Sequence, residues 1–135
     1  MLRPHQRLAD VGFEGDATGT HFAAFDAASA IVGVVSLISE APDESGASRW
    51  RLRGMATDPD RQGQGVGRAL MIGLLDFVAR SGGGALWCNA RLHAVGFYER
   101  FGFVVAGEVF EEPEIGSHVR MARVVELVAG DPLLD

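Results

Sequence analysis

Three glycines at alternate positions mark the segment of the chain most suited to chemistry. Gly63, Gly65 and Gly67 lie where a strand-like pattern gives way to helical spacing. Because glycine has no Cβ atom, the backbone can turn sharply there and a ligand can approach its N–H groups. Those groups and the positive end of the helix dipole favour an anion, and Arg61 and Arg68 add positive charge on either side. The segment therefore predicts a site for a phosphate or diphosphate.

Two common nucleotide-binding motifs do not fit this glycine-rich segment. A dinucleotide loop follows G-x-G-x-x-G, but Arg68 stands at the position of its third glycine. A P-loop follows G-x-x-x-x-G-K-[ST], a string that the sequence lacks. A tight turn that binds nothing is the other interpretation. Three alternating glycines flanked by two arginines favour the binding site over it.

The cysteine and histidine residues offer little further chemistry. Cys88 is the only cysteine, which excludes an intramolecular disulfide and a zinc site built from several cysteines. Its apolar neighbours predict a buried and unreactive thiol rather than a nucleophile. His5, His21 and His93 lack the spacing of metal ligands, so we expect no metal site.

The periodicity of apolar residues predicts the elements that hold these side chains. Val66, Leu70 and Leu74 form the apolar stripe of a long helix that ends at the glycines after Ser81. Residues 1–20 are expected to form an irregular arm. Strands are expected at 21–25, 30–38, 48–57, 85–89, 103–106 and 117–125, and helices at about 65–80 and 92–100. This order of elements predicts a mixed α/β or α+β sheet.

Length and composition narrow the class of protein. A chain of 135 residues that is 47% hydrophobic and 22% charged fits a single globular domain over residues 1–135. Its net charge of −6 argues against nucleic acid or an anionic membrane as the main partner. The longest apolar run, residues 30–38, is shorter than the ~20 residues of a membrane span. Without an apolar signal segment at the N-terminus, we expect a cytoplasmic protein.

Two motifs in the chain resemble the GNAT acyltransferase superfamily. Gln62-x-x-Gly65-x-Gly67, which follows the strand ending at residues 55–59, is similar to the acyl-CoA loop of that family, Q/R-x-x-G-x-G/A. Residues 94–103 are similar to its A-x-x-F-Y-x-x-x-G-F segment. The resemblance covers roughly residues 33–123. It implies an α/β (α+β) fold with a mixed, mostly antiparallel central sheet and helices on both faces.

The resemblance also implies where acetyl-CoA binds. In the family, the strand before the loop and the strand that here carries residues 87–89 splay apart, and the pantetheine arm lies between them. Main-chain groups of Met55 and Thr57 would hydrogen-bond the pantetheine, and the N–H groups from Gln62 or Gly63 to Arg68 would hold the diphosphate. The cofactor-binding residues implied in this way are Met55, Ala56, Thr57, Gln62, Gly63, Gln64, Gly65, Val66, Gly67, Arg68, Asn89 and Tyr98.

The implied reaction is acetyl transfer from acetyl-CoA to a primary amine of a small molecule or peptide by direct attack, with a backbone N–H near Met55 stabilising the oxyanion. Tyr98 matches the position that protonates the departing thiolate, and a phenol with a pKa of ~10 suits a thiol of ~8.5. The other interpretation is that Tyr98 packs beside Phe97 and Phe101, although Tyr98 does not lie on the apolar stripe that those two residues form. Asn89 matches a position that contacts the pantetheine or an attacking water; it could instead cap the strand end.

Two features depart from the family pattern on the acceptor side. Relatives begin with a strand and one or two helices, whereas here only residues 1–20 precede the first expected strand. The acceptor site is then open, or is closed by the C-terminal segment or by a second subunit of a homodimer. The strand before the loop carries arginines in place of a carboxylate, so the base lies elsewhere or water relays the proton. The candidate bases are Glu40, Glu44, Glu108 and His118. The alternative function is a CoA-binding regulatory or interaction module with little catalysis.

Overall fold

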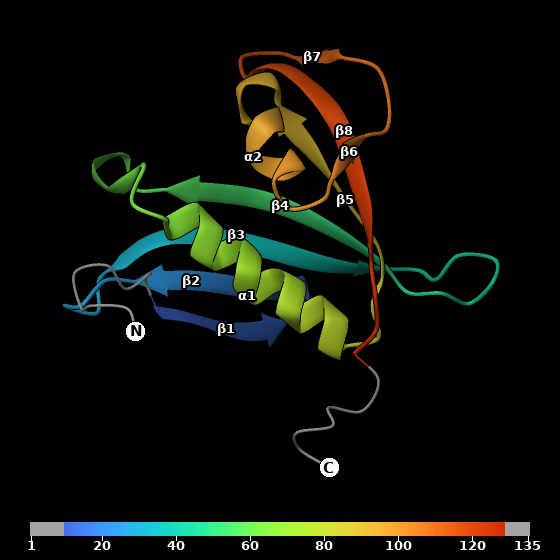
Figure 1. Cartoon of the computed structure of the whole chain (residues 1–135), viewed down its shortest axis with the longest axis horizontal. Coiled ribbons are helices and arrows are strands. Elements are labelled where there is room, and N and C mark those ends of the chain that lie inside the picture. The colour runs from blue at the N-terminus through green and yellow to red at the C-terminus, as the bar shows by residue number, and fades with distance from the viewer. Residues whose placement is uncertain (1–9, 129–135) are drawn as a thin grey trace.

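The computed structural model describes residues 10–128. In chain order its elements are β1 (Asp10–Asp16), β2 (Gly19–Phe25), β3 (Ile31–Glu40), β4 (Arg49–Thr57), α1 (Val66–Arg80), β5 (Gly84–Arg91), α2 (Val95–Glu99), β6 (Val104–Val105), β7 (Phe110–Glu112) and β8 (Gly116–Val125), with 3-10 turns at Pro59–Arg61 and Leu92–Ala94. The strands form one sheet in the order β1-β2-β3-β4-β5-β8-β6, with β7 also paired to β8 (Figure 1). Among the described strands, only β4 and β5 are parallel neighbours, which confirms the predicted mixed, mostly antiparallel sheet.

The first strand, β1, lies where the sequence predicted an irregular arm. It pairs antiparallel with β2 through a tight turn whose shape the side chain of Asp16 holds. Asp16 Oδ1 accepts hydrogen bonds from the N–H groups of Thr18 (2.7 Å) and Gly19 (3.2 Å). The glycines of β1 hid this strand from sequence reasoning, because glycine weakens strand propensity. The first nine residues of the predicted arm lie outside the described residues.

The main core lies between the sheet and α1. The predicted stripe of α1 is confirmed, because Leu70, Leu74 and Val78 are fully buried against the sheet. Alternate residues of the strands meet this stripe, as the period of two in a strand requires. The helix ends where the N–H of Gly83 donates to Val78 O (2.8 Å), a left-handed glycine stop of the predicted kind. Of the helices in the described part of the chain, none is long and apolar enough to cross a membrane.

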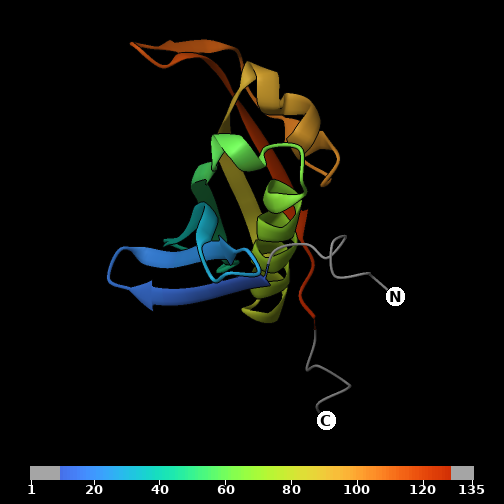
Figure 2. The ribbon, with the colours of Figure 1, turned by 90° about the vertical axis from the view of Figure 1, so that its left-hand side faces the viewer.

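Both helices lie on one face of the sheet, which differs from the predicted arrangement with helices on both faces (Figures 1 and 2). α1 contacts β1 to β4, and α2 contacts β5. The physical reason is the short turn between β1 and β2, which leaves no described segment to cover the opposite side. We call the covered side the helix face and the opposite side the open face. Side chains on the open face include Ser36, Arg51, Arg53, Trp87, Asn89 and Arg120.

Candidate active site

Strands β4 and β5 are paired only at their beginnings. Parallel pairing joins residues 49–51 of β4 to residues 85–87 of β5. Beyond these pairs β4 continues beside β3, and β5 continues beside β8. The two strands therefore diverge, as Figure 1 shows, and each leaves an unpaired edge toward the gap between them. Such edges can accept an extended ligand as if it were an additional strand.

A β-bulge in β4 lies next to this gap. Two residues of β4, Gly54 and Met55, stand opposite Val35 of β3 alone. Gly54 has a φ of +69°, a left-handed conformation that favours glycine. The bulge shifts the alternation of the strand, so that Leu52 before it and Met55 after it both pack against the core.

The direction of the peptide groups at the end of β4 follows from one hydrogen bond. The N–H of Asp58 donates to Val32 O of β3 (2.8 Å). Because successive peptide groups of an extended strand point to opposite edges, those of Thr57 and Met55 face the gap, and that of Ala56 faces β3. Met55 and Thr57, the two residues expected to hydrogen-bond the pantetheine, therefore offer their N–H and C=O groups toward β5.

The glycine-rich segment is open toward solvent. Gly63 and Gly65 have φ values of +80° and +85°, in the left-handed region that a side chain rarely adopts. A Cβ on Gly63 would meet no atom within 4 Å, and Gln62 and Gln64 are exposed beside it. Gly67 has another role, because a Cβ there would lie 3.3 Å from the ring of Phe97. It lets α1 and α2 approach each other.

The first amides of α1 point out of the helix without a partner inside it. The first intrahelical hydrogen bond runs from Ala69 N–H to Gly65 O (3.0 Å), so the N–H groups of Val66, Gly67 and Arg68 have no acceptor within the helix. No side chain caps this end, and the first turn carries no acidic residue. These amides and the helix dipole can receive an anion.

The two arginines that flank this segment in the sequence have different surroundings. Arg61 donates from its guanidinium to Asp26 Oδ2 (2.9 Å), which ties the loop to the turn between β2 and β3. Hydrogen bonds, chiefly from the N–H of Ala30, and the charge of Arg61 lower the pKa of Asp26. Arg68 is exposed and forms no ion pair with any residue between 10 and 128. The charge of Arg61 is therefore balanced by Asp26, whereas no described carboxylate balances that of Arg68.

Tyr98 is the buried residue of α2, with 7% of its surface exposed. Its ring packs edge-on against Phe97 and Phe103, at centroid distances of 5.3 and 5.4 Å. The interpretation that left Tyr98 outside the apolar stripe is wrong, because α2 is a single short turn in which stripe counting fails. No group in the described part of the chain hydrogen-bonds its hydroxyl. Burial, and then the neighbouring Cys88, raise the pKa of Tyr98, so the phenol stays protonated at neutral pH.

Cys88 is buried on the helix face, with 1% of its surface exposed. Burial raises the pKa of its thiol to about 12, so almost no thiolate exists at neutral pH. This confirms the predicted buried thiol.

Asn89 lies on the opposite side of β5 from Tyr98. Its neighbours in the strand, Cys88 and Ala90, are buried on the helix face, so Asn89 points to the open face. There it lines a cavity of about 300 Å³. The residues around this cavity are Asn89, Ala106, Gly107, Glu108, Phe110 and Arg120. The two predicted catalytic residues thus lie on different faces of the sheet.

Comparison with known proteins identifies the family of this chain. Residues 5–125 match the model of the family described as the acetyltransferase (GNAT) domain. The chain belongs to the GNAT acetyltransferase family. It is 34% identical over 127 residues to the uncharacterized N-acetyltransferase YitI of Bacillus subtilis, and the match covers 93% of this chain and 85% of YitI.

Solved structures of other GNAT acetyltransferases share the fold. The ribosomal-protein-S18-alanine N-acetyltransferase of Escherichia coli matches 86% of this chain and 75% of its own, with a TM-score of 0.66 and 24% identity. An aminoglycoside 6'-N-acetyltransferase, solved as a complex with coenzyme A, matches 82% and 74%, with a TM-score of 0.65 and 19% identity. Neighbours with this GNAT fold thus bind coenzyme A.

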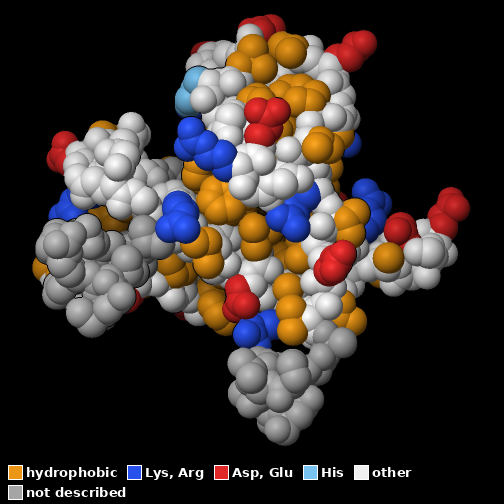
Figure 3. Space-filling model, viewed as in Figure 1, with side chains coloured by type: hydrophobic (Ala, Val, Ile, Leu, Met, Phe, Trp, Pro, Cys, Tyr) orange, Lys and Arg blue, Asp and Glu red, His pale blue; other side chains and the backbone are white. Residues whose placement is uncertain are grey.

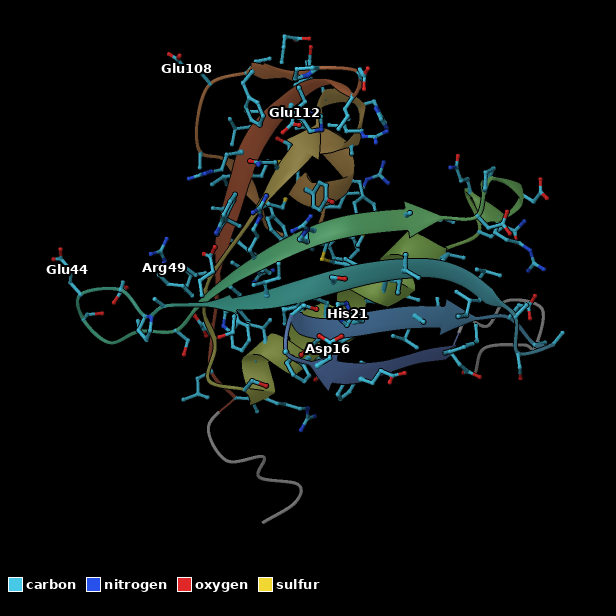
Figure 4. All side chains as sticks on the ribbon, turned by 180° about the vertical axis from the view of Figure 1, so that it is seen from behind. Asp16, His21, Glu44, Arg49, Glu108 and Glu112 are labelled. Carbon is cyan, nitrogen blue, oxygen red and sulfur yellow. The ribbon has the colours of Figure 1, made fainter. Side chains whose placement is uncertain are left out.

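The candidate bases of this GNAT protein have unequal positions. Glu40 accepts a hydrogen bond from Trp87 Nε1 (2.8 Å), and His118 is buried with Nδ1 2.9 Å from Gly116 O. Glu44 lies on the exposed loop between β3 and β4, away from the gap (Figure 4). Glu108 borders the cavity of Asn89. Glu108 is therefore the one of the four that borders this cavity, and it forms no ion pair with another described residue.

A polar chain that sequence reasoning missed crosses the open face of the GNAT sheet. His21 Nδ1 lies 2.8 Å from Ser36 Oγ, and its Nε2 lies 3.1 Å from Asp16 (Figure 4). Hydrogen bonds from Thr18 and then His21 lower the pKa of Asp16 to about 2. Ser36 stands opposite Arg53, beside the bulge. Only the pairing of β1, β2 and β3 brings these side chains together, and no short motif signals it.

Proposed function

We propose that the protein transfers an acetyl group from acetyl-CoA to a primary amine of a small molecule or peptide. The observation that carries the proposal is the gap between β4 and β5, with the uncapped N-terminus of α1 following the end of β4. Membership of the GNAT acetyltransferase family supports it. The residues present fit acetyl-CoA, because the loop at Gly63 is open and the amides of residues 66–68 have no acceptor within the helix.

The main chain holds the cosubstrate in this proposal. Amides of residues 63–68 bind the diphosphate, and Arg68 adds a positive charge. The peptide groups of Met55 and Thr57, which face the gap, hydrogen-bond the amides of the pantetheine arm. The arm then lies along β4 and brings the thioester toward the closed end of the gap. In this proposal side chains contribute little to the binding of acetyl-CoA, so the binding depends mainly on the conformation of the main chain.

The transfer itself proceeds by direct attack. The neutral amine forms a bond to the thioester carbon, and the developing oxyanion accepts a hydrogen bond from the N–H of Met55. The C–S bond then breaks, and the sulfur takes a proton from Tyr98 while the nitrogen loses one to solvent or a nearby base. Cys88 takes no covalent part, because its thiol is protonated and buried.

Two measurements test the proposal together. Acetyl-CoA should raise the unfolding temperature, whereas ATP and NAD should not, because both nucleotide motifs are missing. Release of free thiol from acetyl-CoA in the presence of a panel of amines should then show turnover. Stabilisation without thiol release from any amine would contradict catalysis and leave a CoA-binding module. Equal stabilisation by ATP would contradict the acetyl-CoA site.

A further inference from the structure

A tryptophan lies between two arginines on the open face, at the closed end of the β4–β5 gap. The guanidinium carbon of Arg51 lies 4.6 Å from the ring centre of Trp87, and that of Arg120 lies 4.1 Å from it. Arg51 and Trp87 are also the last paired residues before β4 and β5 diverge. Arg53 follows on the same face, two residues along β4. We call Arg51, Arg53, Trp87 and Arg120 the arginine–tryptophan cluster.

The positive charges of this cluster lack a counter-ion. Within residues 10–128, no carboxylate forms an ion pair with an arginine of the cluster. The nearby carboxylate of Glu40 is engaged by Trp87 Nε1 (2.8 Å) and lies 4.0 Å from Arg49. Arg51 Nε is buried and has no hydrogen-bond partner. A buried donor without an acceptor costs free energy, so the site is incomplete as it stands.

The arginine–tryptophan cluster lies where the acceptor amine would reach the thioester. On the helix face, Tyr98 and Phe103 pack against each other and belong to the buried core. On the open face, by contrast, Asn89 of β5 and Arg120 of β8 line a cavity. A molecule that reaches the thioester therefore approaches from the open face and passes the cluster. Arg120 also lines the cavity of Asn89 and Glu108, so the cluster and this cavity are continuous.

We propose that the acceptor amine also carries a carboxylate, as a free amino acid or an acidic peptide does, and that the arginine–tryptophan cluster binds this carboxylate. The inference rests on the proposed acetyl transfer. Guanidinium groups bind a planar carboxylate through paired N–H donors, and stacking on Trp87 holds two of them in place. Glu108, which borders the same cavity, would attract the ammonium end of such an acceptor.

The first experiment compares each acceptor acid with its amide. Thiol release from acetyl-CoA is measured with L-amino acids, with peptides that carry a free aspartate or glutamate side chain, and with the matching amides. The readout is the ratio of kcat/KM for acid over amide. We expect Arg53→Gln and Arg120→Gln each to lower this ratio about tenfold, the usual loss for one hydrogen bond to a charged group. Comparing this ratio between variants cancels differences in amine reactivity that do not depend on the protein.

Arg100→Gln is the matched control for these variants. It removes the same charge from an exposed arginine at the end of α2, on the helix face. Its ratio should equal that of the unaltered protein. Equal ratios in all four proteins would overturn the inference, because the cluster would then not distinguish a carboxylate. Activity on peptide acids without activity on free amino acids would identify the acidic peptide as the source of the carboxylate.

The second experiment measures binding without turnover. In Trp50→Phe, the remaining tryptophan is Trp87, which reports directly on the cluster. With CoA present, N-acetylglycine should change its fluorescence, and N-acetylglycinamide should not; Arg120→Gln in the same background should abolish the change. Such a signal without thiol release from any amine would refute the acetyl transfer and retain the carboxylate site. Equal signals from the two probes would overturn the carboxylate site and leave the acetyl transfer standing.

Discussion

On the helix face of the sheet, the side chains that meet α1 are apolar and fully buried, whereas on the open face the same strands carry arginines, a histidine and an asparagine. Strand β5 shows the contrast within consecutive residues. Leu86 and Cys88 belong to the core, while Trp87 and Asn89 face the open side. The alternation of a strand thus lets one segment stabilise the fold and present chemistry at the same time.

The outer surface of the helices adds to this comparison. Figure 3 shows acidic and basic side chains interspersed with apolar ones over that side of the molecule. On the open face, arginines gather around Trp87 without paired carboxylates. Mixed charges are typical of a solvated surface, whereas an unmatched cluster beside a gap is typical of a binding site. The two faces therefore differ in how their charges are distributed, a difference that the net charge of the chain does not reveal.

The largest expected effect comes from a substitution in the core on the helix face. Leu74→Ala removes a fully buried side chain of α1 and should lower the free energy of unfolding by about 2–5 kcal/mol. Urea denaturation measures it. Ile72→Ala on the same helix is the control, because that side chain is 44% exposed, and its effect should stay below about 1 kcal/mol. Similar losses in the two variants would contradict the position of the core.

The next largest effect comes from a substitution in the glycine-rich segment that precedes α1. Gly65→Val forces a β-branched side chain into a φ of +85° at the start of α1 and should weaken CoA binding about hundredfold, or about 2.7 kcal/mol. Isothermal calorimetry gives the affinity, and urea denaturation shows whether the variant is folded. Gly96→Ala is the control, since a Cβ there meets no atom within 4 Å. Unchanged affinity in a folded Gly65→Val protein would remove the loop from the site.

Tyr98 belongs to both parts of this comparison. Its ring packs in the core, and its hydroxyl is proposed to donate a proton to the departing sulfur. Tyr98→Phe keeps the ring and should lower kcat about tenfold or more, with the Kd of CoA unchanged. Because burial raises the pKa of Tyr98, the acid form persists at alkaline pH, and kcat of the unaltered protein should show no loss from this group up to about pH 10. Equal losses of CoA affinity and kcat would show a packing role alone.

Sequence reasoning found the elements whose signals are local. The stripe of Leu70 and Leu74, the glycine stop after α1 and the glycine-rich segment all appear within a few residues of one another in the chain. The family resemblance added the mostly antiparallel sheet and the divergence of β4 from β5. The local features could be predicted because near neighbours in the sequence determine them.

The missed features depend on contacts between distant segments. The pairing of Arg61 with Asp26 joins two turns that lie 35 positions apart in the chain. The stacking of Arg51 and Arg120 on Trp87 requires the register of three strands, and periodicity gives no register. The hairpin of β1 and β2 was missed because its glycines outweigh its few apolar residues, and with it the sequence missed the polar chain around His21.

The smallest expected effect tests that hairpin, on the open face. Hydrogen bonds from Thr18 and His21 lower the pKa of Asp16 from 3.8 to about 2, so the folded state favours its carboxylate. The stabilisation is therefore complete well above pH 3.8 and is lost as the pH falls through about 2. Asp16→Asn should lower the unfolding temperature slightly at pH 6, and the difference from the unaltered protein should shrink as the pH approaches 2. Glu14→Gln, on the same strand, is the charge-matched control. A difference for Asp16→Asn that stays constant from pH 6 to pH 2 would show that the carboxylate does not hold the turn, because protonation would then remove nothing.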